Sequence, residues 1–166
     1  RIVRDVQLLA GELIAAGKLA GGNLLKIDGR ISVAASYTLA HEVAHLYRAI
    51  AVADTRVQAY VVVSSTAPEY PVGSRVDSRT GEVTQVNNST ELSPPSFLMH
   101  REGNILRVEI NPAVQVDGDQ IFRDAKLQLQ KLINSGELSG GKLLKINGRS
   151  TVLASFAIAF ELAHLY

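Results

Sequence analysis

The residues with the clearest chemical potential form the pentapeptide His41-Glu42-Val43-Ala44-His45. It spells H-E-x-x-H, a signature of zinc proteases. On a helix, histidines four residues apart share one face and can hold Zn²⁺, while the glutamate activates a water molecule. No third ligand stands at a familiar spacing, and the nearest downstream carboxylate of suitable reach is Glu69, in a proline-flanked loop. A zinc metallopeptidase is therefore one hypothesis.

His45 carries a second hypothesis because it recurs as His164 in an equivalent segment, whereas the residue equivalent to His41 is Phe160. Both recurring histidines are expected at the C-terminal end of a helix. There an imidazole can meet the last carbonyls and the negative end of the helix dipole, which is a purely structural role. Histidine also titrates near neutral pH, so the alternative role is a general acid or base, or a metal ligand.

The tripeptide Asp54-Thr55-Arg56 falls in a tight connection between two expected strands. Aspartate is common in ordinary turns, so one interpretation is that this tripeptide is a purely structural turn. The functional reading combines a carboxylate, acting as a base or as a ligand for a cation, with a guanidinium that can grip a phosphate through two hydrogen bonds.

Two related turns, Asp28-Gly29-Arg30 and Asn147-Gly148-Arg149, each connect an expected strand to an expected helix. Ser32 in the first case, and Ser150-Thr151 in the second, are expected to cap those helices. Free amides at a helix N-terminus, a glycine that permits close approach and a neighbouring arginine together predict a phosphate site. The alternative is a plain turn with a solvated arginine. Neither turn belongs to a Walker or G-x-G-x-x-G motif, so no nucleoside triphosphate site is expected here.

These motifs sit in an internal duplication. Residues 12–30 read ELIAAGKLAGGNLLKIDGR and residues 131–149 read KLINSGELSGGKLLKINGR. The match runs from Ile2 and Ile121 to Tyr47 and Tyr166 at a constant offset of 119 residues, with about half of the positions identical. The first copy lacks the lead-in segment 97–118, and the second copy stops where the first continues through residues 48–76. A complete unit therefore combines the beginning of the second copy with the end of the first, and we expect a longer tandem protein.

The expected elements of one unit follow from periodicity and turn signals. Residues 97–99, 105–110 and 143–146 are predicted strands, the last of them buried, and residues 119–135 and 151–166 are predicted helices, with Gly136 ending the first. In the first copy, residues 48–52 and 58–64 are further strands. The predicted fold class is α/β, with units of order β-β-α-β-α-β-β as an out-of-phase tandem repeat. Residues 1–76 form the C-terminal portion of a first unit, residues 77–95 a linker within a polar stretch that begins at Ser74, and residues 96–166 the N-terminal portion of a second unit.

Composition limits the classes of function. The chain has 166 residues, 46% of them hydrophobic, a formal net charge of +1 and no cysteine. The apolar fraction excludes a disordered or collagen-like chain. The near-neutral charge argues against duplex DNA as a partner, and the longest apolar runs (49–53 and 59–63) argue against a membrane because a spanning helix needs about 18 residues. The absence of cysteine fits a cytoplasmic protein.

The segments 24–30, 39–56 and 60–73 resemble the small CRISPR-associated ring nucleases of type III systems, a family distantly related to CARF sensor domains, in particular its tandem cyanobacterial forms. Their residues read LLKIDGR, LAHEVAHLYRAIAVADTR and YVVVSSTAPEYPVG. The resemblance spans nearly the whole chain, since both copies match it. It implies degradation of cyclic tetra-adenylate, an RNA second messenger, usually with manganese, by homo-oligomers that bind the ring between dimers.

The resemblance also implies site residues. The catalytic histidine, aspartate and arginine of the family fall on His45, Asp54 and Arg56. The ring-binding turn falls on Gly29, Arg30 and Ser32, and in the second copy on Gly148 and Arg149. Two positions depart from the family pattern. Its further histidine after the second strand is replaced by Ser64-Ser65-Thr66, and its D-P-R turn has become Asp54-Thr55-Arg56.

Three hypotheses result. The first is a metal-stimulated ring nuclease that cleaves cyclic tetra-adenylate through attack of a ribose 2′-OH and so damps antiviral signalling. The alternative is a non-catalytic sensor or sponge for the ring, which the two departures favour. The third is the zinc metallopeptidase.

Overall fold

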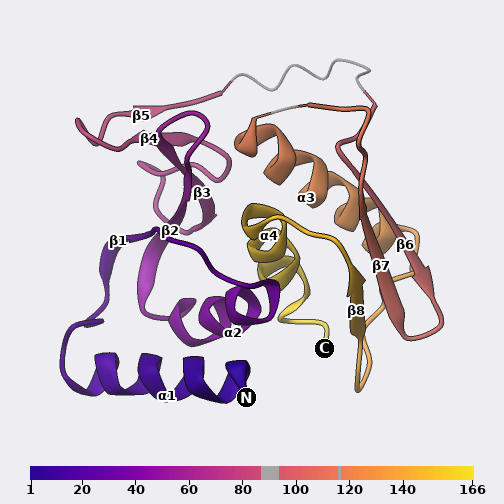
Figure 1. Ribbon diagram of the computed structural model, residues 1–166, viewed down its shortest axis with the longest axis horizontal. Coiled ribbons are helices and arrows are strands. Elements are labelled where there is room, and N and C mark those ends of the chain that lie inside the picture. The colour runs from indigo at the N-terminus through magenta and orange to yellow at the C-terminus, as the bar shows by residue number, and fades with distance from the viewer. Residues whose placement is uncertain (87–93, 116) are drawn as a thin grey trace.

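The computed structural model describes residues 1–86, 94–115 and 117–166 as a mixed α/β structure with two sheets (Figure 1). The larger sheet has five strands in the order β1-β2-β3-β4-β5, and only β1 and β2 run parallel. These strands are β1 (Gly22–Ile27), β2 (Tyr47–Asp54), β3 (Ala59–Ser65), β4 (Arg75–Asp77) and β5 (Val83–Thr84). The apolar, β-branched run of β2 and β3 lies at the centre of the sheet, where both strands are buried.

The second sheet has three strands in the order β6-β7-β8. Strands β6 (Phe97–Glu102) and β7 (Ile105–Ile110) form an antiparallel hairpin around a turn at Gly103, which has a φ of 60°. Strand β8 (Lys145–Gly148) lies parallel to β7. A buried strand was expected over residues 143–146. The strand begins two residues later and is exposed along its whole length, and only β7 pairs with it among the described strands.

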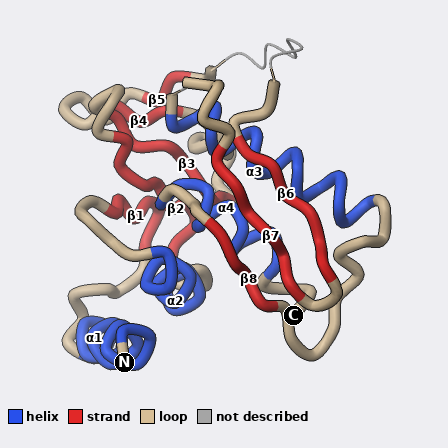
Figure 2. The backbone as a smooth tube through the Cα atoms, turned by 45° about the vertical axis from the view of Figure 1, so that its right-hand side comes forward, coloured by secondary structure: helices blue, strands red, loops and turns tan. Residues whose placement is uncertain are grey.

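Four helices complete the described fold: α1 (Ile2–Ala15), α2 (Val33–Val43), α3 (Gly118–Asn134) and α4 (Val152–Leu162). They pack in the succession α1, α2, α4, α3. Figure 2 shows β6, β7 and β8 side by side at one side of the molecule, the five-stranded sheet at the other, and α4 between them. No helix in the described part of the chain is both long and apolar enough to cross a membrane.

One hydrophobic core joins the two sheets. It combines buried side chains of β2 and β3 with those of the β6–β7 hairpin and the helices α3 and α4. The large, fully buried side chains Phe97, Phe122, Phe156, Leu106 and Leu129 belong to it. The same core includes Val43, Ile50 and Val61 of the first copy. The two copies are therefore stabilised by one shared buried apolar surface.

Residues matched by the duplication adopt matching local structure. Helices α2 and α4 begin and end at equivalent positions, and each is capped by a hydroxyl, with Ser32 accepting from the Ala35 amide (3.3 Å) and Thr151 from the Ala154 amide (3.2 Å). Both caps were expected. The glycines also correspond, as shown by Gly29, with a φ of 121°, and its counterpart Gly148, with a φ of 132°.

Two further expectations differ from the structure. The polar stretch expected as a linker begins with the short strands β4 and β5, which extend the large sheet by antiparallel pairing; residues 87–93 of it lie outside the described residues. The helix expected over residues 151–166 ends at Leu162, since the chain then turns, with the Leu165 amide donating to the Leu162 carbonyl. The hairpin, the first expected helix with Gly136 at its end (φ 80°), and the two central strands are confirmed within a few residues.

Candidate functional site

The three residues expected to act in catalysis do not meet within one chain. His45 precedes β2 and is exposed, whereas Asp54 is the last residue of the same strand, with Arg56 two positions beyond it. The eight residues of β2 are extended at about 3.3 Å per residue, which separates the two ends by about 23 Å. Asp54 and Arg56 therefore form one candidate site, and His45 lies at the opposite end of the strand.

Asp54 is buried, with 7% of its surface exposed, and both of its carboxylate oxygens accept backbone hydrogen bonds. Oδ1 accepts from the Arg56 amide at 3.0 Å, which closes the turn. Oδ2 accepts from the Gly118 amide at 2.7 Å, at the first residue of α3. A carboxylate at this place satisfies one of the free amides of the helix and faces the positive end of its dipole. The side chain expected to be catalytic thus caps a helix of the other copy.

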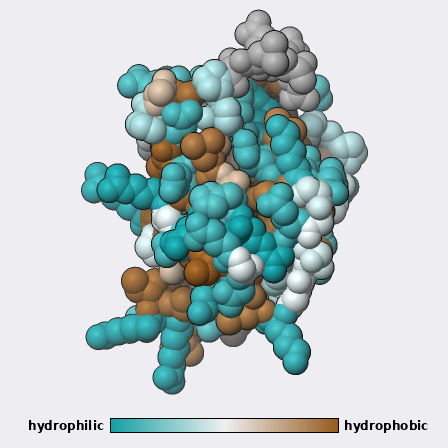
Figure 3. Space-filling view, turned by 90° about the vertical axis from the view of Figure 1, so that its right-hand side faces the viewer, coloured by the Kyte–Doolittle hydropathy of each residue, from teal (hydrophilic) through white to brown (hydrophobic). Residues whose placement is uncertain are grey.

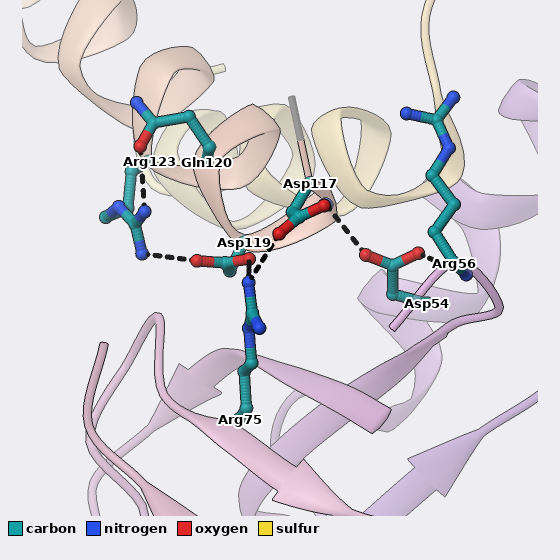
Figure 4. A network of polar contacts seen from close by, with 8 residues as sticks. Asp54, Arg56, Arg75, Asp117, Asp119, Gln120 and Arg123 are labelled. Atoms are coloured by element: carbon teal, nitrogen blue, oxygen red, sulfur yellow. Dashed lines mark hydrogen bonds and ion pairs between the residues drawn. The ribbon is translucent and has the colours of Figure 1, made fainter. Parts of the chain in front are cut away.

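An ion-pair network lies beside this cap (Figure 4). Arg75, from β4, donates from Nε to Asp119 Oδ1 at 3.0 Å and from Nη2 to both Asp119 and Asp117. Asp119 is buried to 1% exposure, and its other oxygen accepts from Arg123 at 2.7 Å. Burial lowers the pKa of Arg75, but the hydrogen bonds and charges of Asp119 and Asp117 outweigh it, so the net pKa is raised. The first turn of α3 is therefore fastened to the large sheet by charge as well as by Asp54.

The residues expected to bind the ring lie in two separate turns. Gly29 and Arg30 follow β1, while Gly148 ends β8 and Arg149 follows it; all four are exposed. The positive φ angles of both glycines are those that favour glycine. Ser32 uses its hydroxyl to cap α2, so its side chain is already committed to the protein.

One cavity joins the motifs of the two copies. It has a volume of about 130 Å³ and lies between Arg56 and Thr151, the N-cap of α4. Its walls combine apolar and polar side chains from the β6–β7 hairpin, the segment that follows it, and α3: Ser96, Phe97, Ile110, Val114, Gln115 and Ile121. An arginine and the N-terminus of a helix at one cavity are the two features expected of a phosphate site.

The H-E-x-x-H pentapeptide does not form a continuous helical pair. Helix α2 ends at Val43, and the Leu46 amide donates to the Val43 carbonyl, so His45 lies in a turn beyond the helix that carries His41. In the described ranges, no group of three or more histidine, cysteine, aspartate or glutamate side chains lies close enough to hold a metal ion. Each oxygen of Asp54 already accepts a backbone hydrogen bond and no second carboxylate or histidine completes a ligand set with it, so the described residues of one chain do not fit a manganese site.

Sequence reasoning missed the partners of this site. Arg75 fell in the polar stretch that begins at Ser74, just before the expected linker. Asp119 was expected only as the first residue of a helix, and Asp117 lay in the lead-in segment before it. The sequence feature that could have indicated this contact is the glycine at position 118, at the start of a strongly amphipathic helix. An added Cβ there would lie 2.2 Å from Asp54 Oδ2 and 2.5 Å from Leu153 Cδ1. Close approach of another element explains why this residue is glycine.

Comparison with known proteins gives no further assignment, because no family model, curated protein or solved structure matches the chain.

Proposed function

We propose that this protein is a ring nuclease of the CRISPR type III kind that binds and cleaves cyclic tetra-adenylate. The observation that carries the proposal is the cavity between Arg56 and Thr151, where the aspartate-arginine turn of the first copy meets the helix that follows the Gly148-Arg149 turn of the second. Both motifs are those that the sequence resemblance assigns to the ring. A small anionic ring also suits a chain with a formal net charge of +1, since a few placed arginines suffice to hold it.

The chemistry needs only groups that this chain carries. The 2′-oxygen of a ribose attacks the adjacent 3′-phosphorus, the bond from phosphorus to the 5′-oxygen breaks, and the products are a 2′,3′-cyclic phosphate and a 5′-hydroxyl. Arg56 and the first amides of α4 would hold the phosphate and stabilise the charge that develops on it. His45 would take the proton from the 2′-hydroxyl, and the leaving 5′-oxygen would receive one from water.

This assignment requires more than one copy of the chain, because about 23 Å of extended strand separates His45 from Asp54. His45 of one copy would act at the Arg56 cavity of another, in a homo-oligomer that encloses the ring. Such an arrangement suits a ring of repeated nucleotides, since symmetric copies can offer the same groups to successive phosphates. A divalent cation, manganese in the resemblance, would have to find its ligands in the same assembly.

A specific observation favours a second function, in which the protein binds the ring without cleaving it. Asp54 is buried and both of its oxygens accept backbone hydrogen bonds, so it stabilises the fold whether or not it acts in catalysis. The Ser64-Ser65-Thr66 stretch also offers hydroxyls where the family resemblance implies a histidine. Under this alternative the protein is a sensor or a sponge for cyclic oligoadenylate.

The test is incubation with radiolabelled cyclic tetra-adenylate, with and without manganese, followed by separation of ring and linear products. Cleavage is expected, and manganese should stimulate it. His45→Ala should abolish it, while His164→Ala, the matched change in the second copy, should leave it intact. Intact ring in every tube refutes the nuclease, and a filter-binding assay on the same samples then decides whether the ring is bound at all.

Mixing variants tests the shared site. His45→Ala and Arg56→Ala are each expected to be inactive, and a mixture of the two should regain cleavage, because some assemblies combine an intact His45 with an intact Arg56. If the mixture stays inactive while the unmodified protein cleaves the ring, the site does not form between copies.

A further inference from the structure

The two copies of the duplication present the same surface, and only one of these surfaces is covered. In the second copy, the β6–β7 hairpin lies over α3 and β8: β7 pairs with β8 in parallel, and β6 packs against α3. As a result Phe122 and Leu132 of α3 are buried, with 2% and 8% of their surfaces exposed.

The equivalent surface of the first copy has no such cover. Strand β1 is the edge strand of the large sheet and pairs only with β2 among the described strands. On α1, Val3 and Leu13 occupy the positions of Phe122 and Leu132, and they are exposed to 47% and 38%. Other apolar side chains of α1 are exposed by more than half: Ile2, Leu8 and Leu9. In Figure 3 hydrophobic surface is visible towards the lower end of the molecule, the end at which α1 lies in Figure 1.

The paired glycines show that the first copy has, at Gly29, nearly the same backbone conformation that lies beside strand β7 in the second copy. Gly148 has Val108 of β7 directly beside it: an added Cβ would lie 1.8 Å from the Val108 carbonyl oxygen. Gly29 has nearly the same φ, yet an added Cβ would meet nothing within 4 Å. Glycine is required for packing at position 148, and at position 29 the same requirement would arise only when a strand lies there.

We infer that the surface formed by β1 and α1 is a docking site for a second β-hairpin with the sequence character of residues 94–115. Its second strand would pair in parallel with β1 in the register observed for β7 and β8, so that Ile105 lies opposite Lys26 and Arg107 opposite Asp28. An exposed sheet edge is a template for such strand addition.

The charges on β1 and the alternation of apolar residues along the hairpin are both compatible with a hairpin docked at this surface. In the second copy Arg107 lies opposite Asn147, which is neutral; at the first copy it would lie opposite Asp28, and opposite charges on facing positions of neighbouring strands stabilise a pair. The alternation of the hairpin fits the surface as well. The buried residues of the hairpin in the second copy are Phe97, Met99, Leu106 and Val108. Equivalent residues would cover Val3 and Leu13 of α1, the counterparts of the buried Phe122 and Leu132.

The test uses the full chain, which has no cysteine, with one introduced by Lys26→Cys. The probe is a synthetic peptide of residues 94–115 with Ile105→Cys. The readout is the rate of disulfide formation, after addition of a fixed amount of a mild thiol oxidant, on a non-reducing gel. Bound thiols have an effective concentration in the millimolar range, so with micromolar peptide the cross-link should form at least about tenfold faster than for a peptide that does not bind.

The matched control is the same peptide with Leu98→Cys in place of Ile105→Cys, which puts the thiol on the outer strand of the hairpin. Equal rates for both peptides overturn the inference, because collision alone would then explain the cross-link. A covalent dimer of the Lys26→Cys chain that forms equally well with and without peptide also overturns it, since the β1 edges of two copies would then pair with each other. Selective capture of the Ile105→Cys peptide supports the hairpin as the occupant, and neither result depends on ring cleavage.

Discussion

Gly118 tests the contact that joins the two copies at Asp54. In Gly118→Ala the new methyl group would lie 2.2 Å from Asp54 Oδ2 and 2.5 Å from Leu153 Cδ1, so both side chains would have to move. Moving Asp54 breaks the 2.7 Å hydrogen bond from the Gly118 amide, and a hydrogen bond to a charged group contributes about 1.5–3 kcal/mol. Overpacking against Leu153 costs about 1–3 kcal/mol, while alanine returns up to about 1 kcal/mol of helix propensity.

The net expectation is a loss of about 2–5 kcal/mol in the free energy of unfolding, or about 4–20 °C in Tm for a chain of this size. Thermal and urea unfolding followed by circular dichroism measure both. Gly11→Ala is the matched control: Gly11 lies inside α1 and an added Cβ meets nothing within 4 Å, so this variant should gain about 0.5–1 kcal/mol. If Gly118→Ala is as stable as Gly11→Ala, Asp54 does not cap α3, and the reasoning is refuted.

Three further outcomes are expected. Arg75→Ala removes one of the two arginines that bind the buried Asp119 and should cost about 2–4 kcal/mol in urea unfolding; an unchanged midpoint would contradict the network. Tyr37 has a buried hydroxyl with no hydrogen-bond partner among the described residues, and burial raises its pKa. Because the folded protein holds this proton more tightly than the unfolded chain, the free energy of unfolding is unaffected by Tyr37 ionisation below the ordinary pKa of 10.0 and falls as pH rises above it. Tyr37→Phe should match or exceed the parent at pH 7 by about 1 kcal/mol and should reduce the alkaline decline, whereas an unchanged decline would exclude Tyr37 as its cause. Hydrogen bonds from Arg107 and then His100 lower the pKa of Glu102, so an NMR titration should find its midpoint below that of an ordinary glutamate, and Arg107→Ala should raise it.

Much of the fold follows from local signals. The hairpin around Gly103 and the end of α3 at Gly136 depend on short-range turn chemistry, which the sequence displays directly. The caps of α2 and α4 are likewise local, because a hydroxyl three residues before its donor amide is enough. The apolar residues 143–146 were expected as a buried strand, but the strand forms over Lys145–Gly148 and is exposed. A short apolar run does not reveal where a strand ends or how many neighbours it has.

The candidate site depends on contacts that no local pattern encodes. The family resemblance implied one site for His45, Asp54 and Arg56. The intervening residues form an extended strand, which keeps the histidine away from the other two. The role of Arg75 depends on Asp119, which lies 44 positions along the chain. Such a partner is found only when the packing of α3 on the large sheet is known.

The cap on α3 also has a consequence for the order of events during synthesis. Gly118 and its acceptor Asp54 are separated by 64 residues, and at about 5–20 residues per second the ribosome delivers the aspartate roughly 3–13 s before the helix it caps. During that interval the Asp54 carboxylate and the Arg75 guanidinium must stay hydrated at the place where α3 will later dock. Contacts of such long range also slow folding, so this half is the part of the nascent chain with the longest wait for its native neighbours.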